Sequence, residues 1–140
     1  MTDITIFHNP RCSNSRNVLA LLRHAGCEPQ IVDYLTAPLD APQLLALAQA
    51  TGLGLRGLMR DKEVAYSALG LGRDDVDETT LLEALQRHPE LLNRPIVVSS
   101  RGAALCRPPQ TAFELLPCAG PLPPFTLENG QQVWDSGLRR

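Results

Sequence analysis

Cys12 is the residue best placed to do chemistry, because polar and basic residues surround it. Arg11 precedes it, Arg16 follows one helical turn later, and His8 lies four residues before it. At the start of a helix, unpaired backbone N–H groups and the helix dipole stabilise a thiolate, and nearby cations add to this effect. We therefore expect Cys12 to be a nucleophile with a lowered pKa. We expect His8 to assist it, either as a proton partner or as a cation.

The other cysteines give Cys12 no evident partner. Cys27, Cys106 and Cys118 lie far from it in the sequence, and Ser15 stands where a second cysteine would complete a Cys-x-x-Cys motif. We therefore expect no local redox disulfide. No Cys or His pairs cluster as they do in structural zinc sites. We interpret these three cysteines as bystanders and expect neither a metal nor a bound organic cofactor.

An anionic substrate would need positively charged partners, and the sequence offers Arg60, Arg94 and Arg107 at the edges of predicted elements. Guanidinium groups bind tetrahedral oxyanions through paired, charge-assisted hydrogen bonds. Taken alone, each of these arginines is more often a surface charge than a ligand. Their spacing does not select them from the other arginines.

The elements that must position these residues begin with a strand, a helix and a second strand. Apolar residues alternate over 3–8, recur at helical spacing over 15–25 and return in a strand over 30–34. Ser13 or Ser15 could cap the helix, and Gly26 would end it. This order predicts a βαβ unit with Cys12 in the turn before the helix.

A helical segment is predicted next, over about 40–92. Capping-box patterns start at Asp40 and Thr80, and a shorter helix is expected over 53–60. A β-hairpin then follows from 95–99 to 103–107, with a final helix over 109–116 and an extended tail from about 117. Together these elements predict an α/β fold: a single thioredoxin-like domain over 1–140, with a mixed sheet, helices on both sides and an inserted helical subdomain.

The composition limits the kinds of partner that this chain is expected to bind. The chain has 140 residues, 44% of them hydrophobic, and its formal net charge is −2 with acidic and basic residues mixed. Binding to nucleic acid or to an anionic membrane surface would need a concentrated basic face, which the sequence lacks. No apolar stretch is long enough to span a bilayer, and no signal peptide is evident. We therefore expect a cytoplasmic protein that binds neither nucleic acid nor membrane.

Several separated motifs occur in a family-specific order. They are His8-Asn-Pro-Arg-Cys12-Ser-Asn-Ser-Arg16, Leu58-Met-Arg60, Asn93-Arg-Pro-Ile-Val-Val98 and Cys106-Arg-Pro-Pro109. Together they resemble the glutaredoxin-linked arsenate reductase family of the thioredoxin-like superfamily, over essentially the whole chain. The resemblance implies that Cys12 attacks arsenate and that Arg60, Arg94 and Arg107 bind the oxyanion. It also implies that His8 favours the thiolate.

The activity implied by this resemblance is the reduction of arsenate to arsenite through a thiol-arsenate adduct on Cys12, an activity of arsenic resistance. Glutathione would serve as co-substrate, and glutaredoxin as the protein partner that regenerates the thiol. Thioredoxin-like domains also carry a cis proline facing the active-site loop. We therefore expect Pro95 to be cis and to direct Arg94 toward Cys12.

Two other interpretations are open at this stage. One is a non-enzymatic, redox-responsive regulator or adaptor of the same fold, and the other is a general glutathione-dependent thiol oxidoreductase. Ser15 argues against the regulator interpretation, because such regulators usually carry Cys-x-x-Cys. The three arginines favour an arsenate enzyme over a general oxidoreductase.

Overall fold

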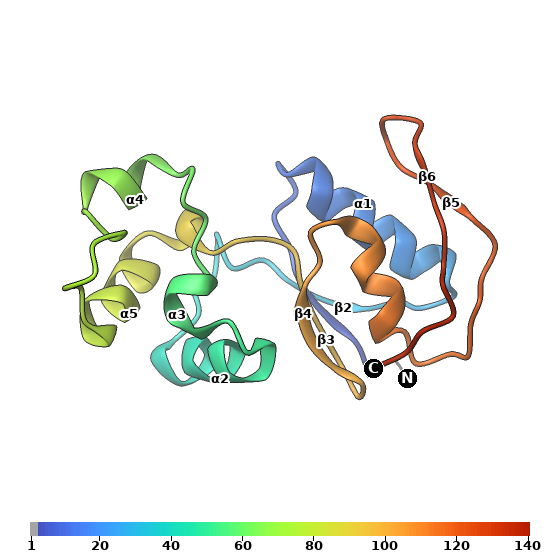
Figure 1. The fold of residues 1–140 in the computed structure, drawn as a ribbon, viewed down its shortest axis with the longest axis horizontal. Helices are drawn as coiled ribbons and strands as arrows, with labels where there is room; N and C mark the ends of the chain where they lie inside the picture. Colours follow the sequence, from blue (N-terminus) through green and yellow to red (C-terminus); the bar gives the residue numbers. More distant parts are fainter. Residues whose placement is uncertain (1–2) are drawn as a thin grey trace. The chain divides into compact units, whose positions relative to one another are not determined.

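The computed structural model describes residues 3–140, and the chain forms two compact units (Figure 1). The first, here called the sheet unit, combines Met1–Asp33 with Arg94–Arg140. The second, the helical unit, is Tyr34–Asn93. The predicted insertion over 40–92 lies within the helical unit. No helix among residues 3–140 is long and apolar enough to cross a membrane.

The sheet unit is built on a mixed sheet with strand order β2-β1-β3-β4. Strand β1 pairs in parallel with β2, while the β1–β3 and β3–β4 pairs are antiparallel. Val97 of β3 lies opposite both Ile6 of β1 and Ala104 of β4, so these three side chains share one face of the sheet. The strands are β1 (Thr5–Phe7), β2 (Gln30–Val32), β3 (Ile96–Ser99) and β4 (Gly102–Leu105).

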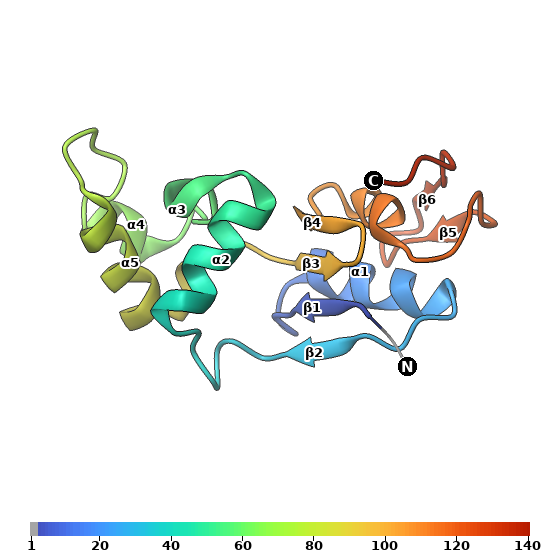
Figure 2. The same cartoon turned by 90° about the horizontal axis from the view of Figure 1, so that it is seen from below.

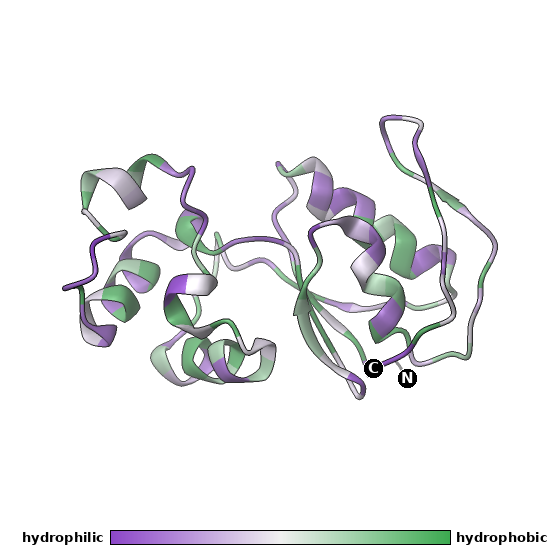
Figure 3. Ribbon diagram, viewed as in Figure 1, coloured by the Kyte–Doolittle hydropathy of each residue, from purple (hydrophilic) through white to green (hydrophobic). Residues whose placement is uncertain are grey.

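Helix α1 (Ser13–His24) connects β1 to β2 and packs on the face of the sheet that carries Ile6 and Val97 (Figure 2). Val18, Leu21 and Leu22 of α1 are fully buried there. Figure 3 shows apolar residues along β3 and β4, whereas α1 carries both polar and apolar residues. This is the pattern of an amphipathic helix that covers a sheet.

The final predicted helix is a 3-10 helix, η2 (Pro109–Leu115), and not an α-helix. It follows Pro108 and has Pro109 in its first turn, and such short segments commonly adopt the tighter 3-10 geometry. Its buried Phe113 joins the same core as α1. Because α1 and η2 cover the same face, these two elements do not meet the expectation of helices on both sides of the sheet.

The tail predicted to be extended also contains a small β-hairpin. Strands β5 (Phe125–Thr126) and β6 (Gln132–Val133) pair antiparallel, and Leu127 and Val133 are buried in the core of the sheet unit. Gly130 in the intervening turn has φ +88°, a backbone conformation that favours glycine.

The helical unit contains several short helices. The capping box at Asp40 is confirmed, because Asp40 accepts from the Gln43 backbone and Gln43 bonds back to the Asp40 N–H. The capping box predicted at Thr80 is wrong: Asp77 is the N-cap residue and its carboxylate accepts from the Thr80 N–H at 2.9 Å. The helices are α2 (Ala41–Thr51), α3 (Gly54–Gly57), α4 (Val64–Ala68), α5 (Glu78–Arg87) and the 3-10 helix η1 (Pro89–Leu91).

Candidate active site

Cys12 is itself the N-cap residue of α1, so the prediction of Ser13 or Ser15 as the cap is wrong. A tight turn leads into the helix, in which the Cys12 N–H donates to the Asn9 carbonyl at 3.0 Å. The Asn9 side-chain oxygen accepts from the Arg11 N–H at 3.0 Å. This turn places a partly exposed thiol at the positive end of the helix.

The surroundings of Cys12 favour its thiolate. Burial opposes ionisation, but the nearby Ser15 and Asn14 backbone N–H groups and the Arg94 and Arg107 side chains outweigh it and lower the pKa of Cys12. The thiol makes no capping hydrogen bond of ordinary geometry; the two N–H groups act as nearby donors. The low pKa therefore arises from the helix N-terminus together with the two arginines.

Arg94 and Arg107 reach Cys12 from the sheet side. The Arg107 Nη1 lies 3.8 Å from the Cys12 sulfur and also donates to the Arg94 carbonyl at 2.9 Å. Arg94 is buried, and its bond to Pro95 is cis, as predicted. The Asn14 amide donates to the Cys106 carbonyl at 3.0 Å, which ties the first turn of α1 to the end of the hairpin. A thiolate and two guanidinium groups thus converge on one place.

His8 is buried and contacts Ser15, a residue that the sequence suggested only as a possible cap. The His8 Nδ1 and the Ser15 hydroxyl are 2.7 Å apart, and the same hydroxyl accepts from the Asn9 N–H at 3.0 Å. Burial lowers the pKa of His8, and attraction by Asp33 opposes this only in part. Burial thus favours the neutral imidazole, and a role as a cation stays a prediction. Its role as a proton partner of Cys12 stays a prediction.

Arg16, which was expected to add positive charge near Cys12, is paired with a carboxylate. Its Nε and Nη2 donate to both carboxylate oxygens of Glu128, at 2.8 and 3.0 Å, and its Nη1 donates to the Pro10 carbonyl at 2.9 Å. The Glu128 contact spans 112 positions of sequence. No local pattern could have revealed it.

Arg60, the third predicted arginine, belongs to the helical unit. Its backbone N–H donates to the Leu91 carbonyl at 2.7 Å, and its guanidinium lies 3.6 Å from the carboxylate of Glu63. Within that unit, Arg60 is a partly exposed cation held near the isolated bridge between Met59 and Leu92.

The remaining cysteines have environments unlike that of Cys12. Burial raises the pKa of Cys106 to about 12, and burial also raises that of Cys27. A high pKa suppresses the thiolate form that nucleophilic attack requires. These environments favour the bystander interpretation for both residues.

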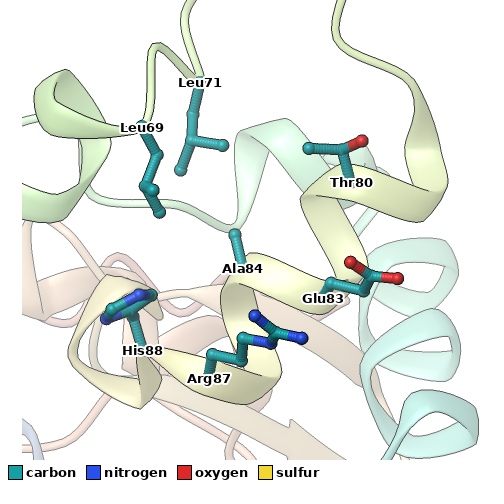
Figure 4. A pocket seen from close by; sticks show the side chains of 7 residues that line it. All are labelled: Leu69, Leu71, Thr80, Glu83, Ala84, Arg87 and His88. Atoms are coloured by element: carbon teal, nitrogen blue, oxygen red, sulfur yellow. The ribbon is translucent and has the colours of Figure 1, made fainter.

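A pocket of about 170 Å³ lies in the helical unit (Figure 4). Leu69, Leu71 and Ala84 supply apolar lining, while Glu83 and Arg87 supply charged groups. Thr80 and His88 complete the lining. Because this lining includes no cysteine and none of the predicted arginines, we place the candidate active site at Cys12.

Comparisons with known proteins identify the family to which this chain belongs. The model of the ArsC family matches residues 7–114. An arsenate reductase of Rhizobium meliloti (strain 1021) is 42% identical over 98% of this chain and 97% of the relative, and one of Escherichia coli (strain K12) is 40% identical over 100% and 99%. The solved structure of an arsenate reductase from Vibrio cholerae superposes with a TM-score of 0.77 at 41% identity. That match covers 81% of this chain and 97% of the other.

Proposed function

This chain belongs to the ArsC family and is an arsenate reductase, and we propose that it works through a covalent thiol-arsenate adduct on Cys12. The observation that carries the proposal is the Cys12 thiol at the helix N-terminus. The Arg107 Nη1 lies 3.8 Å from its sulfur, and the Arg94 side chain also helps to lower its pKa. This arrangement provides both a nucleophile and the positive charge that an oxyanion needs.

In the first step, the Cys12 thiolate attacks arsenic, forms a sulfur–arsenic bond and displaces hydroxide. Arg94 and Arg107 hold the arsenate oxygens and neutralise their charge, and we assign the same part to Arg60. The thiolate is available at neutral pH because the two arginines and the Asn14 and Ser15 N–H groups lower the pKa of Cys12.

In the second step, the thiolate of glutathione attacks the Cys12 sulfur. A disulfide forms between them, and the sulfur–arsenic bond breaks with its electron pair left on arsenic. Arsenic thereby falls from the +5 to the +3 state, and arsenite leaves. The two electrons come from the two thiols, so no metal or bound organic cofactor is needed.

Glutaredoxin completes the cycle in this proposal. Its thiol would take glutathione from Cys12, because the position of a local resolving cysteine is occupied by Ser15, which is buried and bonded to His8. Cycling of this kind requires a compartment that keeps thiols reduced, which supports a cytoplasmic location.

The decisive test is an assay of arsenate reduction with glutathione and glutaredoxin. The wild type should turn over, and Cys12→Ser should lose essentially all activity. Cys27→Ser and Cys118→Ser are matched controls that should keep nearly wild-type rates. A large loss in either control would reveal a resolving cysteine and contradict the proposed cycle.

A second measurement examines the intermediate. After oxidation in the presence of glutathione, mass spectrometry should find one glutathione per chain, located on Cys12. An internal disulfide that includes Cys12 would instead indicate a thioredoxin-coupled cycle. Reduction of glutathione mixed disulfides without any arsenate turnover would indicate a general thiol oxidoreductase.

A further inference from the structure

The C-terminal hairpin lies along helix α1 and reaches the loop that carries the nucleophile. At the far end of α1, the rings of His24 and Phe125 are 5.3 Å apart, and the His24 Nε2 lies 3.3 Å from the Pro123 carbonyl. Near the start of α1, the Glu128 N–H donates to the Asn17 side-chain oxygen at 2.9 Å. The segment from Pro123 to Glu128 therefore runs beside the helix toward Cys12.

At this point Arg16 connects the hairpin to the active-site loop. One edge of its guanidinium makes the two-point contact with Glu128, at 2.8 and 3.0 Å. The remaining nitrogen donates to the carbonyl of Pro10, two residues before Cys12. The planar guanidinium fixes the angle between these contacts, so Glu128 determines how Arg16 holds Pro10.

We propose that Glu128 is a positioning residue of this arsenate reductase, which acts through Arg16 to fix the Pro10 side of the Cys12 loop. The same contact pairs the Arg16 charge with a carboxylate, which offsets part of its attraction for the thiolate. Arg94 and Arg107 approach Cys12 from the sheet, His8 lies behind Ser15, and Arg16 is the charged group that the hairpin controls. Hydrogen bonding to Glu128 raises the pKa of Arg16 most, and attraction by the Cys12 thiolate adds to it.

Exposed ion pairs usually contribute little to stability, so the prediction concerns reactivity. In Glu128→Gln, the Arg16 charge is no longer neutralised by a carboxylate and should favour the thiolate, so the pH midpoint of Cys12 alkylation should fall by about 0.3–0.5 unit, the order expected for one solvent-screened charge. The kcat for arsenate should fall roughly three- to ten-fold, because the loop loses its support. The midpoint does not depend on the amount of folded protein, and it tests the inference even if the proposed catalytic cycle fails.

Two further variants separate positioning from simple charge. In an Arg16→Gln background, Glu128→Gln should shift the midpoint by less than half as much, because the group that it controls is gone. Glu128→Asp keeps the charge but is one methylene shorter, so its carboxylate should not reach the guanidinium in the same two-point contact, and the midpoint should also shift. Glu28→Gln is the matched control, since Glu28 pairs with Arg23 at the other end of the same helix, and its profile should match the wild type.

The inference is overturned by any of three results. The Glu128→Gln profile could superpose on the wild type, or the shift could be equal in both Arg16 backgrounds. Glu128→Asp could also behave as the wild type while Glu128→Gln shifts, which would show that charge alone acts.

Discussion

At the scale of single residues, the protein gives two cysteines of the same sheet unit opposite chemistry. Cys12 has a lowered pKa because N–H groups and arginines outweigh its burial, whereas Cys106 is enclosed and its pKa is raised to about 12. Their positions relative to α1 cause this difference: one thiol faces the helix N-terminus and the other lies in the apolar core.

This contrast predicts selective alkylation of the native protein. Iodoacetamide should modify Cys12 rapidly well below the ~8.5 of a free thiol, while Cys106 should stay unmodified until the protein unfolds. Peptide mapping over a pH series measures both sites in one sample. If Cys12 titrates like a model thiol, the nucleophile assignment fails.

His8 predicts a pH dependence of stability. Burial lowers its pKa in the folded state from about 6.5, so the unfolded chain binds the proton first as the pH falls. Stability should therefore decrease below about pH 6.5, down to the lowered pKa of the folded state. Urea unfolding at a series of pH values gives the free energy of unfolding, which should change less with pH in His8→Gln than in the wild type over this window. An equal pH dependence of stability in the two proteins would mean that folding does not lower the pKa of His8.

At the scale of elements, local patterns predicted the βαβ order, the β3–β4 hairpin and the cap at Asp40. They failed where a distant contact decides the outcome. Ser15 has the residue type of a cap, but tertiary burial makes it the partner of His8 and Asn9. The β5–β6 hairpin did carry a usable signal, because Asn129-Gly130 is a strong hairpin-turn pair. The proline-rich segment before it instead favours an extended tail.

The Asn129-Gly130 turn gives a prediction for this element. Gly130 has φ +88°, where a side chain is strained, so Gly130→Ala should destabilise the protein by about 1 kcal/mol. No heavy atom lies within 4 Å of the added Cβ, so the cost is one of backbone conformation and not of a clash. Chemical denaturation measures it, and an unchanged midpoint would contradict the strain argument.

At the scale of the whole molecule, the sheet unit is assembled from both ends of the chain, and a buried ion pair fixes its last segment. Arg139 contacts both oxygens of Asp135 at 2.8 Å and donates to the Cys118 carbonyl at 2.9 Å. Asp135 also accepts from the Leu122 and Gly137 N–H groups. These hydrogen bonds, those of Arg139 above all, hold the pKa of Asp135 well below its usual range.

Removing this charge should therefore be costly. Asp135→Asn leaves the Arg139 guanidinium buried without its counter-charge, and we expect a loss of about 3 kcal/mol. Wild-type stability from this pair is present above about pH 4 and is lost as the pH falls further, because the unfolded carboxyl takes up a proton first. Glu114→Gln, which breaks the exposed pair with Arg140, is the control and should change stability far less.

The candidate site was predictable only in part, because it also depends on contacts between residues that are distant in the sequence. Cys12 stood out from its immediate neighbours, but Arg94 and Arg107 came from the family resemblance, since nothing local distinguishes them. The link from Glu128 through Arg16 to Pro10 depends on the fold of the tail. Sequence patterns describe neighbours along the chain, whereas this site joins residues more than a hundred positions apart.

The contact between Arg140 and β4 has a consequence for self-association. Strand β4 lies at an edge of the sheet, where unpaired backbone groups can recruit a strand from another molecule into an aggregate. The Arg140 Nη1 donates to the Ala103 carbonyl of this strand at 3.2 Å, and its backbone N–H is held by the Glu114 carbonyl. A cation fixed on the open edge discourages docking of a second strand, so the residue that ends the tail also helps to keep neighbouring molecules apart.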